Sequence, residues 1–130
     1  MVIDTSALVA VLQQEPEHGA LTRTIRDAPS RRLSAATLVE VGIVMQARYG
    51  DVGSRALDAL LTRARVEIIP VTAEHAELAR EAFRRFGKGQ HPAGLNYGDC
   101  FAYALAKSLN APLLYKGGDF ARTDVASALA

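Results

Sequence analysis

Four short segments with strand character alternate with helical stretches, and this order constrains the fold more than any other feature of the sequence. The segments lie at residues 1–4, 32–35, 66–71 and 113–115. The first three are each followed by apolar residues at helical spacing. Strands joined by helices pair in parallel, because each helix returns the chain to the same end of the sheet. The order therefore predicts an α/β domain with a mostly parallel central sheet.

Several helix boundaries can be predicted from glycines and capping residues. Residues 37–49 have helical periodicity, and Gly50 is placed to end that helix, so that Asp51 or Ser54 would cap a separate one. Thr72 begins the helix of residues 73–86, with a histidine instead of the acid of a full capping box.

A glycine-rich segment interrupts the second half of the chain. Residues 87–98 break every periodicity and are expected to form a loop near an active site or a mobile lid. Asp99 is expected to open the helix that follows.

Length and composition fit a single domain covering residues 1–130. A chain with 49% apolar and 22% charged residues can bury a continuous core and is not disordered. No segment resembles a signal peptide or a membrane span, so we expect a cytoplasmic protein without membrane contact. The net charge of +1 permits a nucleic-acid partner without arguing for one.

Four acidic residues lie close to the ends of the expected strands. Asp4 ends the first strand, and Glu40 lies near the start of the helix after the second. Asp99 follows the glycine-rich loop, and Asp119 follows the last strand. The carboxyl ends of parallel strands form one edge of the sheet, where ligands bind. We therefore expect these distant acids to lie at one edge.

Carboxylates gathered in one place raise each other's pKa unless a cation is present. Mg²⁺ or Mn²⁺ would relieve the repulsion, because both ions prefer oxygen ligands. Such an ion can orient and deprotonate water and stabilise a phosphodiester under in-line attack. The pattern therefore indicates metal-dependent phosphodiester hydrolysis.

Each acid also has a purely structural interpretation. Asp4 could cap the first helix, and Glu40 could lie on an exposed helix face. Asp99 could complement a helix dipole, and Asp119 could belong to a Gly-Gly-Asp turn. Their joint placement at strand ends favours the functional interpretation.

Several motifs, taken in order, resemble those of the PIN-domain family. They are V-I-D-T-S-A-L at the start, A-T-L-V-E ending at Glu40, L-N-Y-G-D-C-F-A-Y-A-L-A around Asp99, and L-L-Y-K-G-G-D-F near the end. More narrowly, the chain is similar to the VapC toxin ribonucleases of bacterial VapBC toxin–antitoxin systems. The resemblance runs from Met1 to about Val125.

The resemblance implies a three-layer α/β/α sandwich and a homodimer. It implies an endoribonuclease that depends on Mg²⁺, or on Mn²⁺ in its place, and that inhibits translation or growth. It also implies a cognate VapB-type antitoxin, whose C-terminal segment wraps the toxin and occludes the active site.

The resemblance also assigns site residues by motif. The implied catalytic acids are Asp4, Glu40, Asp99 and Asp119. Metal is expected to bind Asp4 and Asp99 directly, with the other two acids ligating or acting through water. Ser6 looks like the hydroxyl that orients a carboxylate or a metal-bound water.

One position departs from the family pattern. Relatives often carry an acidic or amide residue where this chain has Gly118. The fourth acidic position therefore depends on Asp119 alone.

Three basic residues repeat at four-residue steps toward the glycine-rich loop, namely Arg80, Arg84 and Lys88. They could form a track for an RNA backbone. The alternative is that they complement the dipole of a helix C-terminus.

Two other function classes fit parts of the pattern. A phosphoryl-transfer domain also places Asp at strand ends, but it needs a second acid that is missing here, since Ser6 stands two residues after Asp4. A catalytically silent RNA- or protein-binding domain would keep the fold and the acids without cleaving RNA.

Overall fold

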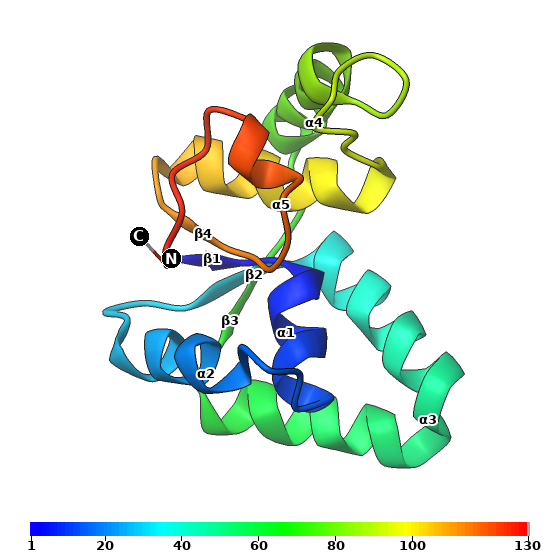
Figure 1. Cartoon of the computed structure of the whole chain (residues 1–130), viewed down its shortest axis with the longest axis vertical. Helices are drawn as coiled ribbons and strands as arrows, with labels where there is room; N and C mark the ends of the chain where they lie inside the picture. Colours follow the sequence, from blue (N-terminus) through cyan, green and yellow to red (C-terminus); the bar gives the residue numbers. More distant parts are fainter. Residues whose placement is uncertain (130) are drawn as a thin grey trace.

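A parallel four-stranded sheet forms the centre of the molecule in the computed structural model, which describes residues 1–129 (Figure 1). The strands are β1 (Val2–Ile3), β2 (Arg32–Ser34), β3 (Glu67–Ile69) and β4 (Leu113–Leu114). Their order across the sheet is β3-β2-β1-β4, and all neighbouring pairs are parallel. This confirms the α/β fold with a parallel central sheet.

Helices cover both faces of the sheet. They are α1 (Thr5–Leu12), α2 (His18–Asp27), α3 (Ala35–Arg63), α4 (Ala73–Phe86) and α5 (Tyr97–Leu109), followed by the short 3-10 helix η1 (Phe120–Arg122). In Figure 1, α4 and α5 lie on one face, and α1, α2 and α3 lie on the other. The three-layer α/β/α sandwich is therefore confirmed. Within residues 1–129, no helix has both the length and the apolar content needed to cross a membrane.

The two central strands divide their side chains between the two helical layers. Val2 and Leu113 belong to the cluster that packs against α4 and α5, whereas Ile3 and Leu114 belong to the cluster under α1, α2 and α3. All four side chains are fully buried. Successive side chains of a strand point to opposite faces, so two-residue strands can serve both layers.

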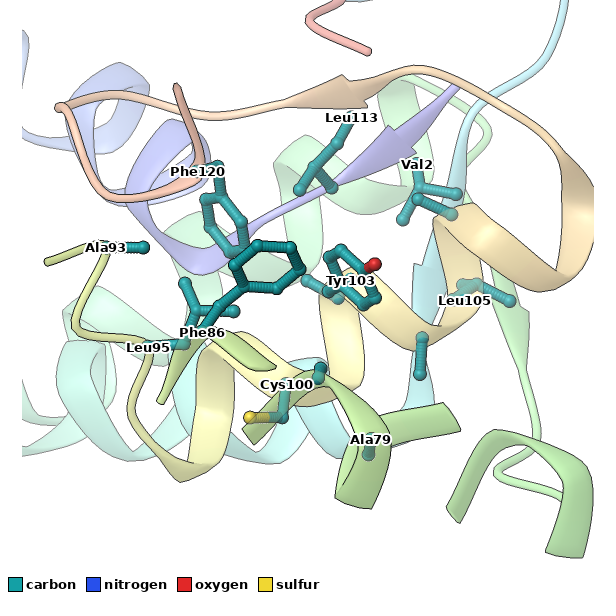
Figure 2. Packing of buried hydrophobic residues seen from close by; sticks show 14 residues of the cluster. Val2, Ala79, Phe86, Ala93, Leu95, Cys100, Tyr103, Leu105, Leu113 and Phe120 are labelled. Atoms are coloured by element: carbon teal, nitrogen blue, oxygen red, sulfur yellow. The ribbon is translucent and has the colours of Figure 1, made fainter. Parts of the chain in front are cut away.

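Aromatic side chains fill the layer formed by α4 and α5. Figure 2 shows Phe86 of α4 beside Tyr103 of α5 and Phe120 of the C-terminal segment. The Phe86 and Tyr103 rings have their centroids 5.8 Å apart, and all three residues are at most 8% exposed. This packing fixes the C-terminal segment against α4 and against α5, the helix that carries Asp99.

The strand order marks one end of the sheet as the expected place for a ligand site. From β1 the chain builds outward through β2 and β3, and then crosses back to place β4 on the other side of β1. Ligand sites in open parallel sheets form outside the carboxyl ends of strands where the order reverses. That point lies beyond β1 and β4, where the backbone N–H of Asp4 donates to the carbonyl of Leu114 at 2.9 Å.

The segment labelled α3 contains the expected pair of helices. Gly50 has non-helical φ 63° and ψ −149°, so the first helix ends where the sequence predicted and a second one follows directly. Neither Asp51 nor Ser54 caps the second helix, because both side chains bind Gln46 instead. The Asp51 carboxylate accepts from Gln46 Nε2, and the Ser54 hydroxyl donates to Gln46 Oε1. The span of 29 residues is thus two helices that meet at a kink at Gly50.

Two helix starts also differ from the sequence-based expectation. Thr72 and His75 form a full capping box on α4, because the His75 Nδ1 atom accepts from the Thr72 backbone N–H. Helix α5 begins at Tyr97 rather than at Asp99, with Asn96 as its cap. The His75 imidazole thus takes the role that Glu or Gln usually fills in a capping box, whereas Asn96 is one of the preferred N-cap residues.

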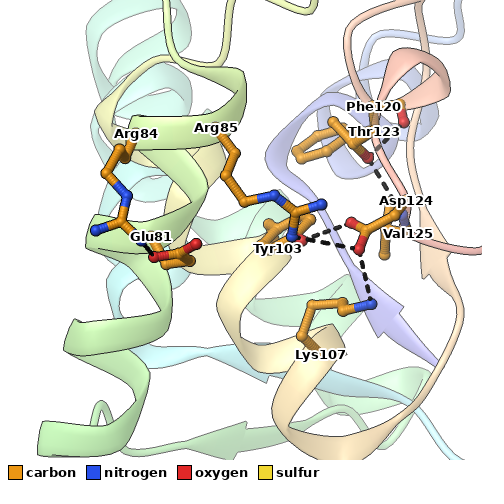
Figure 3. A network of polar contacts seen from close by, with 9 residues as sticks. All are labelled: Glu81, Arg84, Arg85, Tyr103, Lys107, Phe120, Thr123, Asp124 and Val125. Atoms are coloured by element: carbon orange, nitrogen blue, oxygen red, sulfur yellow. Dashed lines mark hydrogen bonds and ion pairs between the residues drawn. The ribbon is translucent and has the colours of Figure 1, made fainter.

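A polar network fastens the C-terminal segment to α4 and α5 (Figure 3). The Tyr103 hydroxyl donates to Asp124 Oδ1 at 2.5 Å, and Lys107 Nζ donates to Asp124 Oδ2 at 3.2 Å. Arg85 adds an ion pair at 3.6 Å. Because Tyr103 is only 3% exposed, its hydroxyl depends on Asp124 for a partner.

We predict that Tyr103→Phe lowers the free energy of unfolding by about 2 kcal/mol, since a buried hydroxyl-to-carboxylate bond is lost. Urea denaturation measures the change. Asp124→Asn and the double variant complete a mutant cycle. Additive effects of the two changes would contradict a direct interaction between these side chains.

Candidate active site

Asp4 sits at the carboxyl end of β1 and is almost completely buried, with 2% of its surface exposed. It caps α1, because its Oδ2 atom accepts from the backbone N–H of Ser6 at 3.0 Å. The Ser6 hydroxyl donates to the same oxygen at 2.7 Å and accepts from the backbone N–H of Lys116 at 3.0 Å. Ser6 thus joins the ends of β1 and β4 through the Asp4 carboxylate.

The second oxygen of Asp4 has no such partner. Oδ1 is buried and has no hydrogen-bond partner among the residues that the structure describes. Burial raises the pKa of Asp4 to about 7, against the opposing hydrogen bonds from Ser6 and with further upward contributions from the charges of Asp99 and Glu40. An unpartnered carboxylate oxygen at this depth is costly in the absence of a cation or a proton.

Glu40 reaches the site from α3 and is held between two contacts. The Thr5 hydroxyl donates to Glu40 Oε1 at 2.5 Å. On the other side lies Gly98, where a Cβ atom would overlap the Glu40 carboxyl group. Position 98 therefore has to be glycine for Glu40 to occupy this place.

Asp99 lies in the first turn of α5 and serves as the second partner of a capping box. The backbone N–H of Asp99 donates to Asn96 Oδ1 at 2.9 Å, and Asp99 Oδ2 accepts from the Asn96 N–H at 3.0 Å. Burial raises the pKa of Asp99, and the charges of Glu40 and Asp119 raise it further.

The structure thus brings three of the four acids into one cluster. The charge of Glu40 helps to raise the pKa of both Asp4 and Asp99, and the charge of Asp99 helps to raise that of Asp4, so the three side chains lie close together. Asp119 is exposed at the start of η1, where its side chain makes no capping bond, and its charge helps to raise the pKa of Asp99. The capping interpretations of Asp4 and Asp99 are correct as local structure, and they coexist with the clustering.

The cluster fits a cation held by few protein ligands. No group of three His, Cys, Asp or Glu side chains in residues 1–129 forms a ready-made cage for a metal ion. Mg²⁺ is commonly bound by only one or two carboxylates, with water and substrate phosphate completing its octahedron. The buried, unpartnered Asp4 Oδ1 beside other acids provides such a donor set.

The predicted basic stripe is exposed and partly neutralised. Arg80 pairs with Glu77 at 3.1 Å, and Arg84 pairs with Glu81, both on α4. Arg80 also lines an apolar groove of about 490 Å³ between α4 and α5. Lys88 is exposed in the loop after α4.

Sequence reasoning missed two residues that shape the cluster, Thr5 and Gly98. Thr5 stands beside Asp4 and was not among the predicted site residues, although its hydroxyl donates to Glu40 Oε1. Gly98 was counted with the loop glycines. Its position directly before an acid at a helix start was the available signal, because such glycines allow close approach of another group.

Comparison with known proteins gives a consistent result. The sequence profile of the family described as "PIN domain" matches residues 1–126. Over 127 residues the chain is 54% identical to "Ribonuclease VapC" of Mycolicibacterium smegmatis, with 98% of each chain covered. It is 50% identical to "Ribonuclease VapC30" of Mycobacterium tuberculosis, with 98% of this chain and 97% of that one covered.

Two solved structures share the fold. The "Sarcin-Ricin loop cleaving toxin" VapC20 of Mycobacterium tuberculosis superposes with a TM-score of 0.77 at 21% identity, covering 95% of both chains. VapBC2 from Rickettsia felis, solved with a fragment of promoter DNA, gives a TM-score of 0.70 at 20% identity, covering 97% of this chain and 94% of the other.

We predict that Asp4→Asn stabilises the metal-free protein at pH 8. The folded pKa of Asp4 lies above its ordinary value of 3.8, so the carboxyl group favours folding least when it is ionised. The difference between 3.8 and about 7 corresponds to on the order of 4 kcal/mol. Urea denaturation in EDTA should show the gain.

The pH dependence provides the control. Well below pH 3.8, Asp4 is protonated in the folded and the unfolded chain, and the advantage of the variant should vanish. Between pH 4 and pH 7 the advantage should grow, and above pH 7 it should stay constant. A gain that is independent of pH would show that burial of the charge is not its cause.

Proposed function

This chain belongs to the PIN-domain family, and on that premise we propose that it is a metal-dependent endoribonuclease, the toxin of a VapBC-type toxin–antitoxin pair. Its relatives at 50–54% identity over nearly the whole chain are named as VapC ribonucleases. The observation that carries the proposal is the buried Asp4 oxygen without a partner, beside the carboxylates of Glu40 and Asp99.

Asp4 and Asp99 would hold the ion, Mg²⁺ or Mn²⁺ in its place. When bound, the ion supplies a Lewis acid for the phosphodiester and lowers the pKa of water nearby. Asp4 would use Oδ1, because Ser6 occupies Oδ2. Asp99 would use the oxygen that does not accept from Asn96.

The remaining groups would order water and move protons. The Thr5 hydroxyl binds one Glu40 oxygen and leaves the other available to orient water or accept its proton. Asp119, which is exposed, would act on water from the solvent side. Attack of water on phosphorus, with the 3′-oxygen leaving, gives a 3′-hydroxyl and a 5′-phosphate.

The partners follow from the same proposal. RNA is the substrate, and a cognate VapB-type antitoxin inhibits the enzyme by covering the acidic cluster. Cleavage of RNA would inhibit translation or growth. One structural neighbour is a VapBC complex, which supports an antitoxin partner.

We also propose a homodimer, with the groove between α4 and α5 as the face covered by the second copy. The groove is lined mainly by apolar residues, and two aromatic side chains at it are exposed: Phe83 by 42% and Tyr97 by 80%. Apolar patches of this kind mark protein interfaces. The homodimer would place Arg80 at the interface rather than on an RNA track.

We predict that purified protein cleaves RNA only with Mg²⁺ or Mn²⁺, and that EDTA or Asp99→Asn abolishes cleavage. Loss of one acid that holds the ion should reduce the rate at least about a hundredfold. End-group analysis of the products should find 5′-phosphates. A 2′,3′-cyclic phosphate would contradict attack by water.

The cleavage assay and a labelling assay separate the two alternative functions. A catalytically silent domain would bind RNA and leave it intact under all metal conditions. A phosphoryl-transfer domain would become labelled by acetyl phosphate, and Asp4→Asn would prevent the labelling.

We predict that Gly98→Ala lowers kcat about tenfold or more, because the new methyl group displaces the Glu40 carboxylate. Gly42→Ala is the matched control. Gly42 lies two residues after Glu40 on α3, and a Cβ atom there would meet nothing within 4 Å. Equal activity of the two variants would show that the position of Glu40 does not matter for cleavage.

A further inference from the structure

A polar pocket adjoins the acidic cluster on the side of α1 and α3. Its volume is about 400 Å³, and Thr5 and Ser6 form part of its lining. These are the residues whose hydroxyls bind Glu40 and Asp4. The pocket therefore lies beside residues that contact two of the acids, on the side of α1 and α3.

Two cations line this pocket, and they differ in their partners. Lys116 is paired with Glu15 and with Glu17, the latter at 3.4 Å. Arg48 is exposed, and no carboxylate lies within 4 Å of its guanidinium among residues 1–129. The charge of Lys116 is thus balanced by ion pairs within the protein, whereas that of Arg48 is not.

A neutral side chain holds Arg48 in place. The Arg48 Nη1 atom donates to Gln13 Oε1 at 2.8 Å, and the Tyr49 hydroxyl donates to the same oxygen at 3.0 Å. Gln13 is the C-cap of α1, the helix that Asp4 caps at its other end. Arg48 is therefore oriented relative to the acidic cluster through one short helix, with most of its donors unused.

The contrast with α4 favours this side for RNA. Arg80 and Arg84, which the sequence pattern proposed, are each paired with a glutamate of their own helix. A planar guanidinium with free donors suits a phosphate group. Arg48, which has no acidic partner, is therefore a better candidate for binding phosphate than Arg80 or Arg84.

We propose that Arg48 binds a backbone phosphate of the RNA substrate, beyond the phosphate that is cleaved and on the side of α1 and α3, with Gln13 as its positioning residue. This inference rests on the proposed ribonuclease function. It assigns the path of the RNA to the face of α1 and α3 (Figure 1).

The test measures RNA affinity without cleavage. A 20-nucleotide single-stranded RNA of mixed sequence is titrated by fluorescence anisotropy with full-length Asp99→Asn protein, over a range of KCl concentrations. Arg48→Gln, added to this protein, should bind about three- to tenfold more weakly at low salt. The slope of log K against log [KCl] should fall by about 0.7, the value for one phosphate contact on a single strand.

Arg55→Gln is the matched control, because Arg55 is also an exposed arginine of α3 without a carboxylate within 4 Å in the described part of the chain. It removes the same charge and should leave the slope unchanged. Gln13→Ala changes no charge and should weaken binding while Arg48 is present but have no effect once it is replaced.

The outcomes distinguish this inference from the proposed function. If the unmodified chain cleaves RNA but Arg48→Gln and Arg55→Gln have the same salt slope, the role of Arg48 is refuted and the ribonuclease stands. If the unmodified chain neither cleaves nor binds RNA, both are refuted.

Discussion

The carboxylate of Asp4 is the group on which the site and its surroundings depend. It lies at the junction of β1, α1 and the end of β4, where it caps the helix and, through Ser6, binds the backbone of Lys116. Only one of its oxygens takes part in this junction. Hydrogen bonds of the local structure thus account for Oδ2 of Asp4. Oδ1 is buried without a partner, near further negative charge. A carboxylate in this state is typical of a functional site.

The neighbouring acids are held by elements that are distant in sequence. Glu40 comes from α3, and its place is set by a hydroxyl of α1 and a glycine of α5. Asp99 is fixed by the capping box of α5, and the segment with Asp119 is anchored at Phe120 and Asp124. The rigid packing of α4, α5 and the C-terminal segment therefore serves a site whose own charges repel each other.

The sequence was informative where structure is local or periodic. The alternation of strands and helices predicted the parallel sheet, and the positions of acids after strands predicted the edge at which they gather. Contacts between distant elements could not be read in the same way. Such contacts depend on side-chain packing. Examples are the position of Glu40 between Thr5 and Gly98, and the ion pairs that Arg80 and Arg84 form with glutamates of their own helix. The break at Gly50 was predicted, but the side chains of Asp51 and Ser54 hydrogen-bond to Gln46 instead of capping the second helix.

The capping box of Asp99 has an evolutionary consequence. One oxygen of this residue stabilises the start of α5, and its side chain also belongs to the acidic cluster. Any substitution that removes the acceptor also removes a capping hydrogen bond from α5. This loss lowers the free energy of unfolding by about 1 kcal/mol, and the total is small in native proteins. A lineage that no longer needs the cluster still selects for a short acceptor at this position. Persistence of an acid or amide at position 99 among diverged copies is therefore weaker evidence of activity than persistence of an acid at position 4.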